Sequence, residues 1–356
     1  MRWGANKPLI EERDLDAAVA AGILDAATRQ RLVMFSRDLR QGAAGPDEEQ
    51  FRLLTGFNDI FVTIAIGLLL FAVSSLAGRV TPVLAPVAIA GVSWVLAEYF
   101  TRQRRMALPS IVLLLAFVGG VYGSAVVLLS GNPADLSVGL QGGQGAWAIT
   151  FAGLVAAGAA YGHWRRFMVP ITVAVGAAAL SVFFVVLVGG VVSGRIGRAD
   201  SLLLMVSACG AGVFALAMWF DSRDLARVTR RTDVAFWLHL LAAPMIIHPV
   251  FSATGLLTGA SAPMSAAIVI LVYLVLTIIA LAIDRRALLV SALGYVIYAI
   301  QALLGRGDGL SASYGVTALV IGLFLVLLSA AWRPVRARVL AMLPLSLTGR
   351  LPRAAT

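Results

Sequence analysis

Charged residues and cysteine are scarce in this sequence. Only 13% of its 356 residues are charged, whereas a soluble domain carries about 25%. Hydrophobic residues make up 60% and the mean hydropathy is +0.91, so in water the chain would expose a large apolar surface. The single cysteine, Cys209, excludes an internal disulfide and a cysteine-based zinc site. The composition therefore predicts a protein embedded in lipid.

Polar interruptions are rare after residue 57, where apolar runs follow one another. Each run has close to the roughly 20 residues that a helix needs to cross about 30 Å of hydrocarbon, and none shows the alternation of a half-buried strand. We predict an all-α, polytopic transmembrane bundle of about ten spans. The expected spans are residues 58–77, 83–100, 108–130, 145–162, 168–192, 201–220, 234–257, 264–283, 288–304 and 313–332.

The net charge of +10 comes from the apolar part of the chain. Residues 1–57 hold 8 basic and 9 acidic side chains, and the remainder holds 20 and 9. The excess lies in short arginine clusters between the apolar runs. That is the positive-inside pattern of membrane proteins rather than the footprint of a nucleic-acid binder, so we expect the lipid bilayer and no nucleic acid as a partner.

The loops alternate in arginine content. One set of four loops holds eleven arginines, and the other set holds four in five loops. Basic loops stay in the cytoplasm, which places the arginine-rich loops, both termini and the basic tail at 333–356 on that side. The first long apolar run begins near Asn58, and we expect no signal peptide ahead of it.

The segment before the membrane domain has a helical pattern. We expect residues 1–46 to form a short cytoplasmic helical hairpin, covering 9–41, followed by a linker. The first helix ends near Gly22, Asp25 caps the second, and the second helix has an apolar stripe of Leu32, Phe35 and Leu39. Helices this short bury no core of their own, so they pack on the membrane domain, a second copy or a cytosolic partner. Residues 47–57 form an interfacial lead-in to the ten-span domain at 58–332.

Polar residues inside spans are costly and are therefore functional candidates. Asn58 and Asp59 open the first span, where helix capping at the headgroups is the alternative explanation. Glu98 lies near the end of the second span, four residues before Arg102, which is the spacing of an ion pair along a helix. These three residues are secondary candidates.

The seventh span carries the main candidate site. His239 lies about 9 Å and His248 about 22 Å along it, at 1.5 Å per residue, and we expect Asp233 to cap its start. Pro244 and Pro249 predict a kink or break in its outer half. A broken helix with a titratable group resembles the sites of secondary transporters. The two histidines face opposite ways and are not a metal pair; the alternative is a histidine in a structural contact between helices.

Paired arginines recur in the expected cytoplasmic turns. Arg104-Arg105 and Arg165-Arg166 are each followed by three apolar residues and a proline. Arg230-Arg231 and Arg285-Arg286 continue the pairs without the proline. Two interpretations remain open: duplication of a helical hairpin, or the general preference of such turns for arginine and of first helical turns for proline. We expect His163 to lie in one of these turns, exposed to solvent.

Four stretches of the sequence resemble one family. They are DAAVAAGILDAATRQRLVMF within 16–40, DEEQFRLLTGFNDIF at 47–61, RRTDVAFWLHLLAAPMIIHP at 230–249 and DRRALLVSALGYVIYA at 284–299. The chain is similar to a family of uncharacterised bacterial membrane proteins with an N-terminal domain of unknown function. The resemblance implies a multi-pass protein of a Gram-negative inner membrane and brings no activity with it.

Two functions remain open at this stage. We find no catalytic residues, no metal-ligand spacing and no cofactor motif, so we expect no enzyme. The first hypothesis is a transporter or permease-like protein for a small solute, with its site near the seventh span. The second is a membrane scaffold or sensor whose residues 9–41 dock a cytosolic protein.

Overall fold

The computed structural model describes residues 12–42, 57–130, 145–196, 198–225, 227, 229–253, 263–304, 310–344 and 351. Every regular element within these residues is a helix, which confirms the all-α class. Most of the expected linker and lead-in between 42 and 57 lies outside the described residues.

The helices follow the expected apolar runs closely. Each of the ten runs falls on one helix, or on a helix continued by a π-helical segment in the case of α4 and η1. The elements are α1 (Glu12–Ala20), α2 (Ala26–Gly42), α3 (Phe57–Gly78), α4 (Leu84–Ala97), η1 (Glu98–Gln103), α5 (Ala107–Ser130), α7 (Ala146–Phe167), α8 (Ile171–Ile196), α9 (Arg198–Ser222), α10 (Arg230–Ala253), α11 (Pro263–Ile283), α12 (Ala287–Leu304), α13 (Leu310–Ala330) and α14 (Trp332–Met342).

Six helices in the described part of the chain are long and apolar enough to cross a membrane. They are α3, α4 with η1, α5, α8, α9 and α10. The pair α13 and α14 makes a seventh span if the 75° bend between them is counted within one crossing. Several apolar helices of this length make the protein an integral membrane protein.

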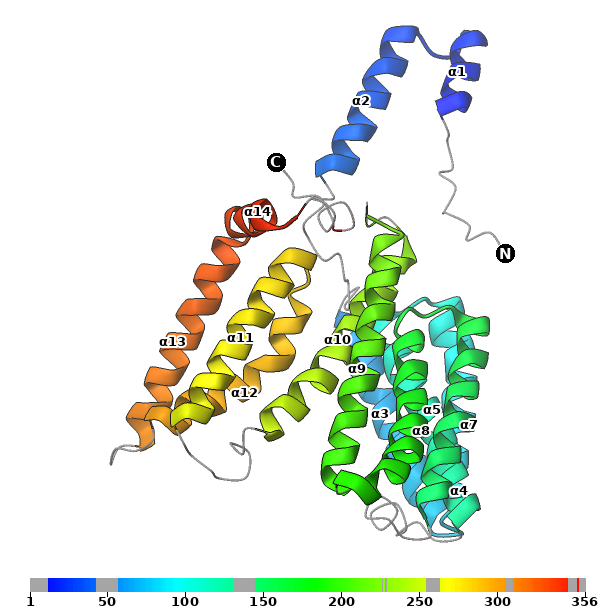
Figure 1. The fold of residues 1–356 in the computed structure, drawn as a ribbon. Coiled ribbons are helices and arrows are strands. Elements are labelled where there is room, and N and C mark those ends of the chain that lie inside the picture. Colours follow the sequence, from blue (N-terminus) through cyan, green and yellow to red (C-terminus); the bar gives the residue numbers. More distant parts are fainter. Residues whose placement is uncertain are drawn as a thin grey trace.

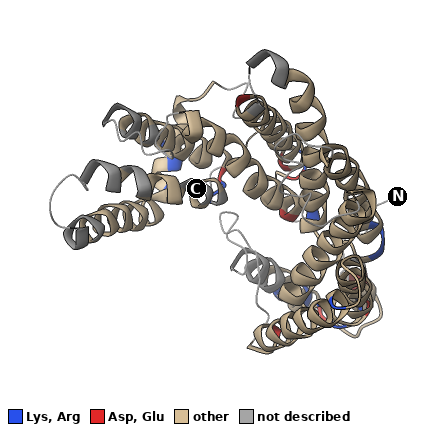
Figure 2. Ribbon diagram, turned by 90° about the horizontal axis from the view of Figure 1, so that it is seen from below, with Lys and Arg blue, Asp and Glu red and all other residues tan. Residues whose placement is uncertain are grey.

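The outward faces of these helices are apolar. On α3, Phe57, Phe61 and Phe71 are between 64% and 82% exposed, and Leu68 is 66% exposed. Charged residues are sparse along the ribbon (Figure 2). Such a surface would be unfavourable in water and is compatible with hydrocarbon.

Helix α10 lies between two groups of helices (Figure 1). Val234, Leu238 and Ala242 pack with side chains of α8 and α9. Ile247 and Phe251 belong to a different core, shared with α11, α12, α13 and α14. Helix α10 is therefore the element that joins the α3–α9 group to the α11–α14 group.

Of the kink or break expected in the seventh span, the break is wrong and the kink stays a prediction. Helix α10 runs without interruption from Arg230 to Ala253, with Pro244 and Pro249 inside it. Neighbouring helices and local adjustment allow proline within membrane helices, and α10 packs on both sides of this region. The expected cap is also wrong, because the helix starts three residues earlier and Asp233 lies in its first turn.

Four turns share an unusual backbone conformation. Arg105, Met168, Arg227 and Asp284 have φ of 53°, 57°, 52° and 57°, and they are the non-glycine residues with positive φ among those described. They lie in the four arginine-rich turns: η1–α5, α7–α8, α9–α10 and α11–α12. Left-handed φ costs a side-chain-bearing residue about 1 kcal/mol or more, but it is common where a helix ends. The four residues stand at different positions relative to the arginine pairs, so duplication of a helical hairpin stays a prediction.

The N-terminal helices show the expected cap. The backbone N–H of Thr28 donates to Oδ1 of Asp25 at 2.6 Å, and the Thr28 hydroxyl donates to Oδ2 at 2.7 Å. These hydrogen bonds lower the pKa of the Asp25 carboxyl. Gly22, with φ of 71°, lies between α1 and α2 as predicted. The side chains of Phe35 and Leu39 lie outside the described residues.

The expected basic tail begins with a helix. Helix α14 bends by 75° from α13 and packs against α11. Arg336 is only 2% exposed, so this arginine is part of the protein interior. The first part of the segment 333–356 is therefore structural rather than a solvated tail.

One glycine pair gives a test of the helix packing. A Cβ on Gly120 would lie 2.7 Å from the carbonyl oxygen of Pro86 and 2.8 Å from the nitrogen of Ala90, whereas a Cβ on Gly119 would meet nothing within 4 Å. Gly120→Ala should therefore push α5 away from α4 and destabilise the protein by about 1–3 kcal/mol. Gly119→Ala should be neutral or stabilising, by up to about 1 kcal/mol. Thermal unfolding of the detergent-solubilised variants measures both, and equal melting temperatures would contradict this packing.

Candidate functional site

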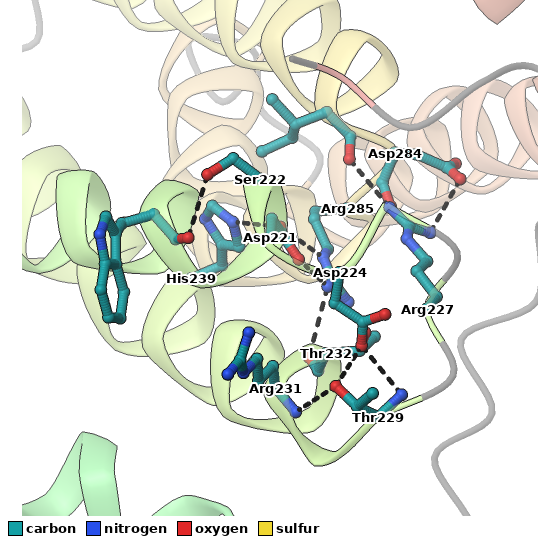
Figure 3. A network of polar contacts seen from close by, with 12 residues as sticks. Asp221, Ser222, Asp224, Arg227, Thr229, Arg231, Thr232, His239, Asp284 and Arg285 are labelled. Atoms are coloured by element: carbon teal, nitrogen blue, oxygen red, sulfur yellow. Dashed lines mark hydrogen bonds and ion pairs between the residues drawn. The ribbon is translucent and has the colours of Figure 1, made fainter. Parts of the chain in front are cut away.

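A buried carboxylate holds three elements together. Asp221, in the last turn of α9, is 3% exposed and forms an ion pair with Nη2 of Arg285 in the α11–α12 turn. The Nε of Arg285 donates to the same carboxylate at 3.2 Å. Nε2 of His239, on α10, lies 3.0 Å from Oδ2. The three side chains converge in Figure 3. We call Asp221, His239 and Arg285 the triad.

The triad is fully enclosed by protein. His239 is 0% and Arg285 is 1% exposed, and a charge buried in this way is strongly unfavourable unless it is paired. Arg285 also donates to the carbonyl oxygen of Thr232 at 3.3 Å. Within the described residues, Nδ1 of His239 has no hydrogen-bond partner. With Nε2–H donating to Asp221, this free nitrogen can accept a proton.

A second carboxylate connects the same turns to α14. Arg227 donates from Nη1 to Asp284 at 2.9 Å, and the indole N–H of Trp332 donates to the other oxygen at 2.8 Å. Nε of Arg336 lies 3.7 Å from that oxygen and donates to the carbonyl oxygen of Leu281 at 3.1 Å. Asp284 thus ties the α9–α10 turn, the α11–α12 turn and α14 together.

A third carboxylate organises the start of α10. Asp224 accepts hydrogen bonds from the backbone N–H of Thr229 at 2.9 Å and from the hydroxyl of Thr232 at 3.0 Å. Asp224 therefore supplies the hydrogen bonds at the beginning of this helix that we had expected from Asp233. The carboxylates Asp221, Asp224 and Asp284 together match the charges of Arg227, Arg285 and Arg336.

The two histidines of the main candidate site are separated, as expected from their spacing. His239 is buried in the triad, while His248 is exposed and its Nδ1 lies 2.7 Å from the hydroxyl of Tyr295. Pro244 lies on the helix between them and Pro249 directly follows His248. Asp233 faces a cavity beside α5 and α8. The candidate residues thus do not form one site. His239 is the candidate that contacts the charged cluster, by which we mean Asp221, Asp224, Asp284, Arg227, Arg285 and Arg336.

The secondary candidates lie in the α3–α8 part of the protein. Glu98 pairs with Arg102 at 3.2 Å, as the spacing predicted, and also with Arg166 on α7 at 2.7 Å. Asn58 and Asp59 lie in the first turn of α3, with Asn58 exposed and Asp59 only 2% exposed. The structure confirms the helix-end ion pair and extends it into a bridge between η1 and α7.

The expectation that His163 is solvated is wrong. Helix α7 continues to Phe167, so His163 lies inside the helix, and it is 0% exposed. Its ring packs among Trp94, Phe117 and Phe167, with centroid distances of 6.1, 5.9 and 4.5 Å. The arginines that follow His163 predicted that the loop begins before this residue. The helix instead continues for one more turn, to Phe167.

Most members of the charged cluster were not among the sequence candidates. Asp221, Asp224 and Asp284 lie at the ends of apolar runs, where an acid is ordinary. The available signal was their position beside arginines, in a sequence with only 18 acidic residues. The pairing of Asp221 with Arg285 joins residues 64 positions apart, which no local pattern reveals.

The comparisons with known proteins add no identity. No family model, no curated protein and no solved structure matches this chain. In the described part of the chain, no group of three or more histidine, cysteine, aspartate or glutamate side chains is arranged to hold a metal ion.

The triad predicts a clear order of stabilities. Arg285→Met leaves the Asp221 carboxylate buried with only His239 as a partner, and should cost about 3–5 kcal/mol. The double variant Asp221→Leu/Arg285→Met removes both charges and should recover much of that loss. Thermal unfolding in detergent measures the series. The two single variants are Arg285→Met and Asp221→Leu. A double variant whose loss of stability equals the sum of their two losses would contradict the pairing.

Proposed function

We propose that the chain is a permease-like transporter of a small solute, with ten spans in a bacterial inner membrane. The apolar helices support the membrane location, and the arginine-rich turns support an orientation with these turns and both termini in the cytoplasm. The triad is the centre of the proposed transport site.

The single observation behind this proposal is the position of the triad. Asp221 belongs to the α3–α9 group, Arg285 belongs to the α11–α14 group, and His239 lies on the helix between them. Many transporters work by moving one helix group against another around a polar site. An ion pair that crosses this boundary holds the groups together at their arginine-rich end.

Protonation gives the triad a means of opening. A proton on Nδ1 of His239 places a second cation beside Arg285, and the two cations then compete for one carboxylate. A proton on Asp221 removes the charge that holds both of them. Either event weakens the contact between the two helix groups, so the proposed transport is coupled to protons.

Charge movement in reconstituted vesicles tests this proposal. Proteoliposomes on a solid-supported membrane are exposed to pH jumps with panels of small anions, cations, amino acids and sugars. We expect a pH-dependent current with at least one solute class for the wild type, and its loss in His239→Gln. His248→Gln is the matched control on the same helix, and it should keep the current because His248 lies outside the triad.

Two results would contradict the transport proposal. One is a current in His239→Gln equal to that of the wild type. The other is the absence of any current across the whole panel, for a wild-type protein that is monodisperse before reconstitution.

A membrane scaffold or sensor is the second candidate function. Ile23, in the turn between α1 and α2, is 78% exposed, and Leu32 and Met34 on α2 are 42% and 59% exposed. Figure 1 shows α1 and α2 beyond the ends of the other helices. Apolar side chains that no other part of the described chain covers favour docking of a cytosolic protein.

Deleting residues 1–46 tests the scaffold function. We expect the truncated protein to keep its melting temperature and to lose a protein that co-purifies stoichiometrically with the full chain. The same loss should follow from Leu32→Asp/Met34→Asp, whereas Arg31→Gln should retain the protein as a surface control. A full-length protein that purifies alone would contradict this role.

A further inference from the structure

A second polar site lies on the opposite side of α10 from the cluster of Asp221. An open cavity of about 540 Å³ is lined by the η1–α5 turn, the α7–α8 turn and the first turns of α10. This volume is in the range of small-molecule sites. Four arginines line it, together with one acid, Asp233: Arg102, Arg105, Arg166 and Arg230.

Two of these arginines have no hydrogen-bonded acid, although Arg230 acts electrostatically on Asp233. Arg102 and Arg166 pair with Glu98. In the described part of the protein, neither Arg105 nor Arg230 forms an ion pair or a hydrogen bond through its guanidinium. Because Asp233 contributes one negative charge, the lining and Glu98 together retain an excess of two positive charges. A cavity of this kind attracts an anion.

The backbone adds to this attraction. The lining includes Ala107, Ile171 and Arg230, which are the first residues of α5, α8 and α10. Three helix N-termini therefore meet at the cavity, and each carries a partial positive charge. Such an arrangement suits an oxyanion with several acceptor atoms.

We propose that this cavity binds a phosphate group, held by Arg105 and Arg230. Arginine matches phosphate oxygens in a two-pronged geometry. The remaining walls are apolar, with Phe167, Val169 and Trp237 among them, so the phosphate of an anionic phospholipid fits the cavity better than free phosphate does. This binding is independent of transport and goes beyond the proposed function.

Binding to the full chain in a neutral detergent tests the proposal. Native mass spectrometry measures the dissociation constant of a short-chain phosphatidylglycerol, with the matching phosphatidylcholine as the zwitterionic comparison. We expect tighter binding of phosphatidylglycerol by the wild type, and at least tenfold weaker binding by Arg105→Gln/Arg230→Gln. Arg104→Gln/Arg231→Gln removes the same charge from neighbouring positions that do not line the cavity, and should bind within twofold of the wild type.

A conservative variant protects the test against misfolding. Arg105→Lys/Arg230→Lys keeps both positive charges and removes the two-pronged guanidinium geometry, so it should fold and bind the lipid several-fold more weakly. Competition by inorganic phosphate separates the two sources of the ligand: displacement of the lipid identifies free phosphate as a ligand, and failure to displace it identifies the lipid form. The proposal is overturned if the Arg105/Arg230 variant binds as tightly as the wild type, or if both lipids bind equally.

Discussion

The structure depends on the pairing of charges that are buried at one end of the helix bundle. Asp221, at the end of α9, is compensated by Arg285 and His239, and Asp284 is compensated by Arg227 and by groups of α14. Unpaired, each of these charges would be too costly to bury. Because the partners come from different turns, satisfying them fixes how the α9–α10 turn, the α11–α12 turn and α14 meet. Hydrophobic contacts are non-directional and give no comparable selection among helix arrangements.

The same turns bear on the prediction of internal repetition. Each has one non-glycine residue in the left-handed region, and each follows an apolar helix and precedes another. The η1–α5 and α7–α8 turns each have an Arg-Arg pair followed by proline. In each of the other two turns one arginine forms a buried ion pair: Arg227 in the α9–α10 turn and Arg285 in the α11–α12 turn. If the hairpins share an origin, the first two turns came to surround an arginine-lined cavity and the last two a charge-paired joint.

The sequence predicted the helices well and the site poorly, for one physical reason. The length of a span is set by the thickness of the bilayer, so the expected runs coincide with helices. Six of the described helices are long and apolar enough to cross, and the count of ten spans stays a prediction. Asp25 and Glu98 were found from local spacing. The partners of Asp221 and the burial of His163 depend on the rotation and packing of whole helices. Apolar residues all round a membrane helix leave no periodic signal for that rotation.

Proline is the clearest example of a local rule overridden by packing. Pro244 and Pro249 predicted a break, yet α10 is continuous and supplies side chains to the cores on both of its sides. A helix packed on two sides can remain helical through its prolines. Its continuity matters for the proposed function, because a single helix contacts both helix groups.

The central claim is that the triad joins two helix groups and can open. Cryo-electron microscopy of the protein in lipid nanodiscs, at neutral and at acidic pH, tests it most directly. At neutral pH, Asp221 should lie between His239 and Arg285. At acidic pH, a second conformation should appear in which Arg285 has separated from Asp221 and a hydrated cavity reaches His239. A dry bundle with the same closed contact at both pH values would contradict the account.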